Sequence, residues 1–340
     1  MIDTVKIYAE IPKDIYEKIY NKSIVKSSVN RKTGELMYEV INDHLEGSYS
    51  SSLSVRVGCG VKYGFCNLGY YIEIEGSYHK ILLGYNSHNG FYNLENICLK
   101  LIELAEYSYN VKLPIIENWF LQRCDIAICY DLGSQENVKN YINSLSRCSY
   151  PRRKAKFYYD ESVYLSGTTT TLKIYNKLLE FRKHDLKKFI STDFQIENYL
   201  NEIKGFVRFE CEIKKKMLVN IYNENHIKIV NVKYEDLKKV WSDEFMKVLN
   251  LIENELEIVR GMQDVKNRLL EVYKKGQAIR LYNFYCAIQL EGLADVKNSF
   301  QRATFYRYIA ELKHARIDFS QMYKIEETFY FNPFEAQEVA

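Results

Sequence analysis

The stretch TTTTLKIYNKLLEFRKH, residues 168–184, decides the fold because it joins a strand pattern to a helix pattern. Its β-branched half, Thr169–Asn176, suits a pleated backbone and predicts a strand. The basic half that follows predicts a helix. Side chains alternate along a strand, so Tyr175 shares a face with Lys173 and Lys177. A tyrosine in this setting is either a core residue or a nucleophile. The residues on the other predicted strands distinguish these two interpretations.

Three further predicted strands have one apolar face and one face that bears charges. The charged residues are Glu73 in Tyr70–Ile74, Arg123 and Asp125 in Trp119–Tyr130, and Arg208 and Glu210 in Phe206–Ile213. A solvated face with cross-strand ion pairs explains any one of these strands taken alone. Carboxylates in the middle of a strand are disfavoured without a partner, however. Four such strands in one chain therefore favour a shared site.

The residue types on these faces suit phosphate chemistry. Asp125, Glu210 and Glu73 are predicted to hold Mg²⁺ or Mn²⁺, because these hard cations prefer oxygen ligands. The cations predicted to bind phosphate are Arg123, Arg208 and Lys173. A tyrosine beside such a centre is able to attack the phosphate and form a covalent intermediate.

Short strands alternate with helices over residues 1–218, and parallel βαβ signals are few. This pattern predicts the α+β class, with an antiparallel sheet and helices packed on one face. Residues 219–340 predict a smaller helical domain with amphipathic helices at Tyr234–Val259, Ala278–Leu290 and Phe300–His314. A boundary near residue 218 is therefore expected.

Two basic regions are candidate DNA-binding surfaces. In SRCSYPRRKAKFYY, Ser146–Tyr159, aromatic residues are mixed with the cations Arg152, Arg153, Lys154 and Lys156. A solvated loop explains most charge runs, but the position directly before the tyrosine strand favours contact with DNA. The last two predicted helices suggest a helix-turn-helix with Arg302 and Arg307 facing DNA. Because the segment between them is longer than a tight turn, a winged or merely bundled pair is an equal alternative.

The composition limits the other classes of function. The net charge is only +3, so a nucleic-acid surface has to be local. The eight cysteines form no C-x-x-C pair, which favours free thiols in a reducing cytoplasm. No apolar run is long enough to span a membrane, and the start of the chain lacks a signal-peptide core. There is no phosphate-binding G-x-x-x-x-G-K-[ST] loop and no pair of histidines flanking one hydrophobic residue.

Four strand motifs follow one another along the chain. They are Ile72-Glu73-Ile74, Arg123-Cys124-Asp125, Tyr175 with Lys177 and Glu180 (Y-x-K with a later glutamate), and Gly205 to Glu210 (G-x-V-R-F-E). In this order they resemble the gene II replication initiator family of filamentous phages and related phage and plasmid Rep proteins. The V-R-F-E strand is the most specific of the four.

The resemblance implies a Rep- or relaxase-like nuclease domain and a rolling-circle replication initiator. Such a protein nicks one strand of an origin, stays joined to the 5′ phosphate through a tyrosine, leaves a 3′ hydroxyl as primer and later rejoins the displaced strand. The implied nucleophile is Tyr175, with Lys177 and Glu180 as accompanying catalytic residues. The implied partners are double- and single-stranded origin DNA and a host helicase and polymerase, in the cytoplasm of a bacterial host and away from any membrane. An ordinary phenol has a pKa near ~10, so Lys177 and a metal are expected to activate it.

Two alternatives stay open. A mobilisation relaxase would use the same chemistry, although relaxases usually show a histidine cluster and the six histidines here are dispersed. A non-catalytic origin-binding or copy-number regulator on the same scaffold would bind DNA without nicking it. If the protein does nick, then Tyr158, Tyr159 and Tyr164 are rival nucleophiles.

Overall fold

The computed structural model describes residues 1–23, 25–29, 31–34, 36–41, 43–46, 52–59, 69–85, 88, 90–145, 150, 152–186, 193–256, 262–291, 293–317, 319, 331–334, 336 and 338. The chain divides into two compact units. Unit 1 comprises Met1–Ser146, Tyr150–Lys247 and Phe331–Ala340, and unit 2 comprises Arg147–Ser149 and Val248–Tyr330.

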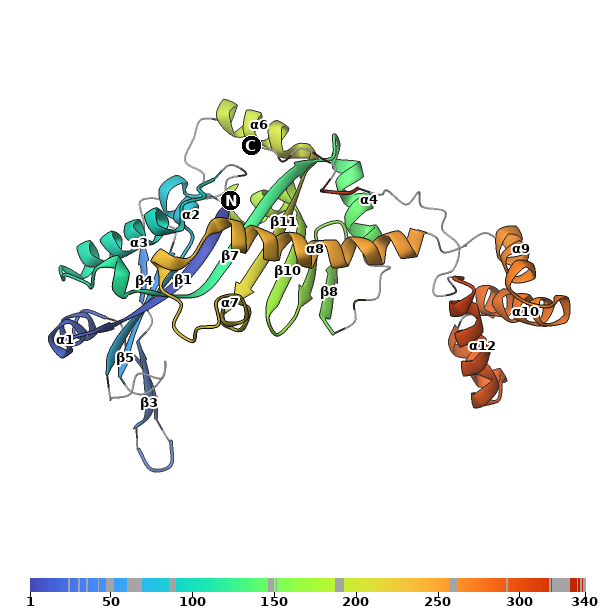
Figure 1. Cartoon of the computed structure of the whole chain (residues 1–340), viewed down its shortest axis with the longest axis horizontal. Coiled ribbons are helices and arrows are strands. Elements are labelled where there is room, and N and C mark those ends of the chain that lie inside the picture. The colour runs from blue at the N-terminus through green and yellow to red at the C-terminus, as the bar shows by residue number, and fades with distance from the viewer. Residues whose placement is uncertain are drawn as a thin grey trace. The chain divides into compact units, whose positions relative to one another are not determined.

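Unit 1 is built on an antiparallel sheet, and the predicted α+β class is confirmed. Within the described residues this sheet has nine strands in the order β4-β5-β6-β1-β7-β11-β10-β9-β8 (Figure 1). Their bounds are β1 Ile2–Ile11, β4 Asp43–Glu46, β5 Ser52–Cys59, β6 Tyr70–Gly76, β7 Phe120–Asp131, β8 Lys154–Tyr158, β9 Ser162–Ser166, β10 Thr170–Asn176 and β11 Phe206–Lys214. A separate hairpin pairs β2, Val25–Val29, with β3, Leu36–Ile41.

The strand register brings the predicted charged faces onto one side of this sheet. Across β10 and β11, Lys173 lies opposite Glu210 and Tyr175 lies opposite Arg208. Asp125 lies on the same side of the neighbouring strand β7, because its cross-strand partner on β11 is Glu212, two residues from Glu210. The central strands therefore share one polar face, as the sequence predicted.

Helices cover the opposite, apolar face. These helices are α3 Leu94–Tyr109, α4 Gln135–Leu145, α7 Lys215–Tyr222 and α8 Tyr234–Leu256. The shorter α1 Lys13–Tyr20 contacts β5 and β6, and α2 Tyr78–Leu83 contacts β1 and α3. Phe209 of β11 packs against Tyr141 of α4 and against Trp241 and Phe245 of α8. The indole of Trp241 also donates a 3.1 Å hydrogen bond to the carbonyl of Phe209. This aromatic layer fixes β11, and with it the polar residues that point the other way.

One end of the polar face carries its own small core. Phe206 shares that face with Arg208 and packs with residues of α5, Lys177–His184, and α6, Asp193–Glu202. The buried members of this cluster are Leu178, Phe181, Tyr199, Ile203 and Phe206. The candidate site lies on the polar face in a cleft lined by residues of α5 and of the β8–β9 hairpin.

The segment after residue 218 begins inside unit 1. Residues 219–247 lie with the sheet, because α8 buries Trp241 and Phe245 on it. The chain end also returns to unit 1, where Phe331 contacts Tyr130 and Phe334 contacts Trp241. In the structure, therefore, the chain passes from unit 1 to unit 2 within α8, after Lys247, rather than at residue 218. A boundary of independent folding at 218 stays a prediction.

Unit 2 is helical. Its helices among the described residues are α9 Met262–Val272, α10 Lys275–Glu291, α11 Leu293–Ser299 and α12 Arg302–His314, in addition to the end of α8. A shared core holds α9, α10 and α12 together and includes Leu269, Leu281, Phe284, Phe305 and Leu312. The sequence predicted α10 and α12 but not α9 and α11.

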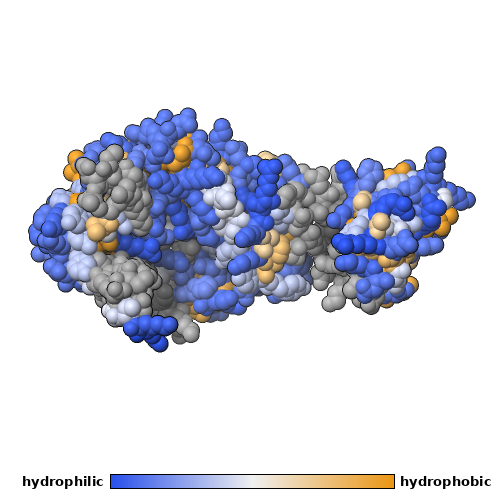
Figure 2. Space-filling model, turned by 90° about the horizontal axis from the view of Figure 1, so that it is seen from below, coloured by the Kyte–Doolittle hydropathy of each residue, from blue (hydrophilic) through white to orange (hydrophobic). Residues whose placement is uncertain are grey.

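The surface drawn in Figure 2 is mostly hydrophilic where it is coloured, with small, separated hydrophobic patches. Scattered apolar side chains of this kind are normal on a water-exposed protein. Across the described ranges, no helix is both long enough and apolar enough to pass through a membrane. The described cysteines Cys59, Cys98, Cys124, Cys129, Cys211 and Cys286 are free thiols, as predicted.

Candidate active site

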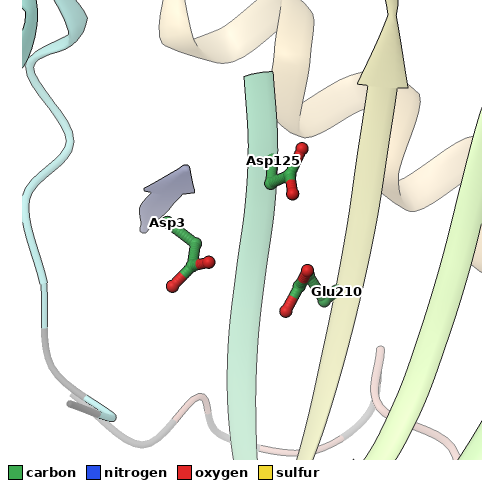
Figure 3. Close-up of side chains that lie close together, drawn as sticks. All are labelled: Asp3, Asp125 and Glu210. Atoms are coloured by element: carbon green, nitrogen blue, oxygen red, sulfur yellow. The ribbon is translucent and has the colours of Figure 1, made fainter. Parts of the chain in front are cut away.

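Three buried carboxylates from three adjacent strands lie together on the polar face. Among the described residues they form the candidate metal-binding group, and one oxygen of each lies within 4.8 Å of the others. Figure 3 shows Asp3 arising from β1, Asp125 from β7 and Glu210 from β11. An oxygen-only set of this kind suits Mg²⁺ or Mn²⁺, the cations that the sequence predicted.

Asp3 is the member that the sequence analysis missed. Ile2 pairs with Ile126 and Val5 pairs with Cys124, so β1 has one residue more than β7 between these two pairs. Such a β-bulge re-aims side chains, and here it accompanies the turn of the Asp3 carboxylate toward its two partners. From the sequence, the first strand is predicted over Val5–Ala9, which leaves Asp3 outside the alternation pattern. The available signal was an acidic residue directly after Ile2, at the start of a strand.

Three cations neutralise this cluster. Arg208 donates a hydrogen bond of 2.7 Å to Asp3 Oδ1, and Lys173 Nζ donates one of 2.6 Å to Glu210 Oε1. The guanidinium of Arg123 donates hydrogen bonds to both carboxylate oxygens of Asp125. Burial alone would raise the pKa of Asp3, but Arg208, together with Lys80, His79 and the Thr4 hydroxyl, acts against burial and lowers that pKa to about 2. Burial raises the pKa of Asp125 to about 7 although Arg123 opposes the rise. The cluster is therefore held by matched charges, and Asp125 is more easily protonated than Asp3.

Tyr175 reaches this cluster directly. Its hydroxyl donates a hydrogen bond of 3.0 Å to Glu210 Oε2. Burial raises the pKa of Tyr175 well above its ordinary value, and the charge of Glu210 raises it further while Arg208 acts in the opposite direction. The resting phenol is thus protonated, with a carboxylate oxygen already in place to accept its proton.

A cleft of about 700 Å³ opens over this group. Its lining includes the three carboxylates, Tyr175, Arg123 and Lys173, and further out Lys80, Lys156, Lys183 and His184. Cations around the rim favour an anionic ligand, while the acidic group at the base favours a metal ion.

Lys177 and Glu180 pair with each other at the start of α5. Lys177 Nζ lies 2.9 Å from Glu180 Oε2, and Lys177 is fully buried. The hydrogen bond of the Tyr175 hydroxyl goes to Glu210 instead. The ammonium of Lys177 pairs with Glu180 rather than with the Tyr175 hydroxyl, so activation of the phenol by Lys177 stays a prediction. Glu180 itself lines the cleft.

Glu73 does not join the carboxylate group. It lies on β6, which β1 separates from β7, and its carboxylate lies 3.8 Å from Lys6 Nζ. The carboxylate that lies with Asp125 and Glu210 is Asp3, because β1 is the strand beside β7, and Glu73 as a metal ligand stays a prediction.

The predicted basic patch divides between the two faces of the sheet. Arg153 contacts the Thr170 hydroxyl and Glu244 of α8, which places it on the helix-covered face. These contacts give Arg153 a structural role, and its contact with DNA stays a prediction. Lys154 and Lys156 lie on the cleft side, since Lys156 pairs with Tyr164 and Tyr164 pairs with Lys173. Arg152 is an exposed turn residue with a positive φ of 64°.

Arg302 and Arg307 are exposed on α12 of unit 2. The guanidinium of Arg307 lies over the ring of Tyr308, 5.3 Å from its centroid. The predicted long link between the last two helices contains α11, and only Phe300 and Gln301 separate α11 from α12. A helix, a short turn and a second helix are thus present, and DNA binding by α12 stays a prediction.

Comparison with known families gives the class of this protein, which is that of the phage replication-associated proteins. The family model for the N-terminal region of the gene II replication-associated protein matches residues 1–236, and the chain belongs to this family. Membership supports a role as a replication initiator that works on DNA. No curated protein matches the chain.

Proposed function

We propose that this protein is a rolling-circle initiator that nicks one strand of its origin through Tyr175. The observation that carries the proposal is the hydrogen bond from the Tyr175 hydroxyl to Glu210, inside a cleft that also holds Asp3 and Asp125. In the nicking step, Tyr175 Oη attacks the phosphorus and its proton passes to Glu210. The P–O3′ bond breaks, so the product is a 5′-phosphotyrosyl link and a free 3′ hydroxyl that takes up a proton and primes synthesis.

Asp3, Asp125 and Glu210 would hold Mg²⁺ or Mn²⁺ in this proposal. The bound ion would offset charge on the phosphate as the bond to tyrosine forms. One of the three cations that neutralise the carboxylates would then be available to the substrate. Lys173 is the best placed, because it lines the cleft and lies beside Tyr175 in the strand. Arg123 and Arg208 would mainly fix the carboxylates that they contact.

The reverse reaction would rejoin the displaced strand. A phosphotyrosyl bond keeps the energy of the phosphodiester, so a 3′ hydroxyl attacks it and releases Tyr175 without a nucleotide cofactor. The proposed setting is the cytoplasm of a bacterial host, where a helicase and a polymerase of the host would extend the primer.

The test uses supercoiled DNA that carries the cognate origin. Incubation with Mg²⁺ or Mn²⁺ should give relaxed circles with covalently attached protein, and digestion of the adduct should give a peptide that contains Tyr175. An adduct on Tyr158, Tyr159 or Tyr164 would overturn the assignment. Tight origin binding with no nick under any divalent cation would favour a regulator.

A further inference from the structure

The β8–β9 hairpin forms one side of the cleft and has no role in the chemistry above. Its cleft-side residues are Lys154, Lys156 and Tyr158 on β8 and Ser162, Tyr164 and Ser166 on β9. The strand register gives this list: Tyr158 pairs with Ser162, which pairs with Tyr175 on β10. The hairpin therefore continues the polar face from Tyr175 to the edge of the sheet.

Two rows of side chains cross the sheet from the carboxylate group to this edge. One row runs from Glu210 through Lys173 and Tyr164 to Lys156. The other runs from Tyr175 through the small Ser162 to Tyr158. Neighbouring strands are ~5 Å apart, so Tyr158 lies ~10 Å from Tyr175, within reach of one DNA strand held at the cleft.

The aromatic residues of the hairpin present a ring to solvent. Tyr158 keeps 49% of its surface exposed, although it lies on the cleft side. Tyr164 contacts it edge to face, with ring centroids 5.9 Å apart and an interplanar angle of 80°. An aromatic ring braced on one side and open on the other is suited to stack on an unpaired base.

The hairpin is also held rigidly at its turn. Asp160 exchanges hydrogen bonds of 2.7 and 3.0 Å with the side chain of Asn143 on α4. The backbone N–H of Asn176, at the end of β10, donates a hydrogen bond of 2.9 Å to the backbone carbonyl of Glu161. Because the turn is fixed in advance, little conformational entropy is lost when a ligand binds to the hairpin.

We infer that the cleft-side face of the β8–β9 hairpin binds single-stranded DNA next to the scissile phosphate. Tyr158 stacks on a base, and Lys154 and Lys156 contact the phosphates on either side. This inference extends the proposed function and depends on it for the identity of the bound DNA strand. Stacking on a base and contact with phosphates are tolerant of sequence, so this face should bind single strands with little dependence on sequence.

The test measures binding separately from cleavage. Full-length protein with Tyr175→Phe leaves the oligonucleotide intact, and a single-stranded origin oligonucleotide with 2-aminopurine placed at successive positions reports both affinity and stacking. In this background Tyr158→Ala should weaken single-strand affinity about tenfold, as expected for one lost stacked base, and should relieve the quenching of one probe position. Tyr158→Phe should keep both signals, because it keeps the ring.

The matched control is Tyr107→Ala, on α3, where the tyrosine is 88% exposed. It should leave affinity and quenching unchanged. An affinity of Tyr158→Ala within twofold of its parent, or a loss in Tyr158→Phe as large as in Tyr158→Ala, would overturn the inference. If Tyr175 never forms an adduct but Tyr158→Ala still weakens single-strand binding, the nicking proposal fails and the DNA-binding hairpin stands.

Discussion

The hydroxyl of Tyr175 donates a 3.0 Å hydrogen bond to Glu210, which lies on the neighbouring strand two residues beyond Arg208, the cross-strand partner of Tyr175. This contact joins the candidate nucleophile to the candidate metal group. In the proposed reaction Tyr175 forms the bond to phosphorus, whereas Glu210 accepts its proton and also contacts Lys173, so replacing the one or the other should have different consequences.

Replacement of Tyr175 by phenylalanine should abolish the covalent adduct and the nick. The ring still packs, and the lost hydrogen bond should lower the free energy of unfolding by only about 1 kcal/mol. Origin affinity in a mobility-shift assay should stay within about twofold. The matched control is Tyr164→Phe, which changes a second tyrosine of the same cleft and should still nick. Residual adduct in Tyr175→Phe would show that another tyrosine is the nucleophile.

Asp3 and Glu73 give opposite predictions for the metal. Asp3→Asn should reduce nicking at least about 100-fold and weaken Mn²⁺ binding measured by calorimetry, because a charged ligand is lost. Glu73→Gln should keep nicking within about threefold, since Glu73 lies two strands away from β7. Both variants should be compared at matched folded fractions by circular dichroism, because Asp3 also pairs with the buried Arg208. Equal losses in both would contradict the assignment of Asp3.

Arg153 and Lys154 are neighbours in sequence with different predicted effects. Arg153→Ala should lower the free energy of unfolding by about 3 kcal/mol, because it leaves the largely buried Glu244 without this charge partner. Lys154→Ala should leave stability nearly unchanged and reduce the slope of log affinity against log salt by about 1, as for one lost phosphate contact. Chemical denaturation and binding at several salt concentrations measure the two effects. The reverse result, with Arg153→Ala changing the salt dependence and Lys154→Ala changing the stability, would support contact of Arg153 with DNA.

His79 should make the protein less stable in acid. Burial, with Asp3 opposing it, lowers the pKa of this histidine from 6.5 to about 4. The unfolded chain therefore binds the proton first, so the histidine favours unfolding as the pH falls from about 6.5 toward 4. Its contribution to the loss is at most about 3 kcal/mol. Denaturation in metal-free buffer at pH 7 and pH 5 should show a smaller difference for His79→Gln than for the natural chain.

Much of the candidate site could be predicted from local pattern. The alternation along Phe206–Ile213 placed Arg208 and Glu210 opposite the residues that pack on α8, and the register confirms this. The same pattern in β7 and β10 placed Asp125, Lys173 and Tyr175 correctly on the polar face. Alternation is a property of each strand by itself, so it needs no knowledge of the neighbours.

The sequence by itself determined the α+β class, the polar face of each central strand and the family resemblance, because these depend on residues close together in the chain. Only the tertiary structure decided which strands are neighbours. Strand order made Asp3 rather than Glu73 the companion of Asp125 and Glu210, and it turned Arg153 toward Glu244. Such pairings join residues far apart in the chain, and the spacing of residues along the sequence carries no information about them.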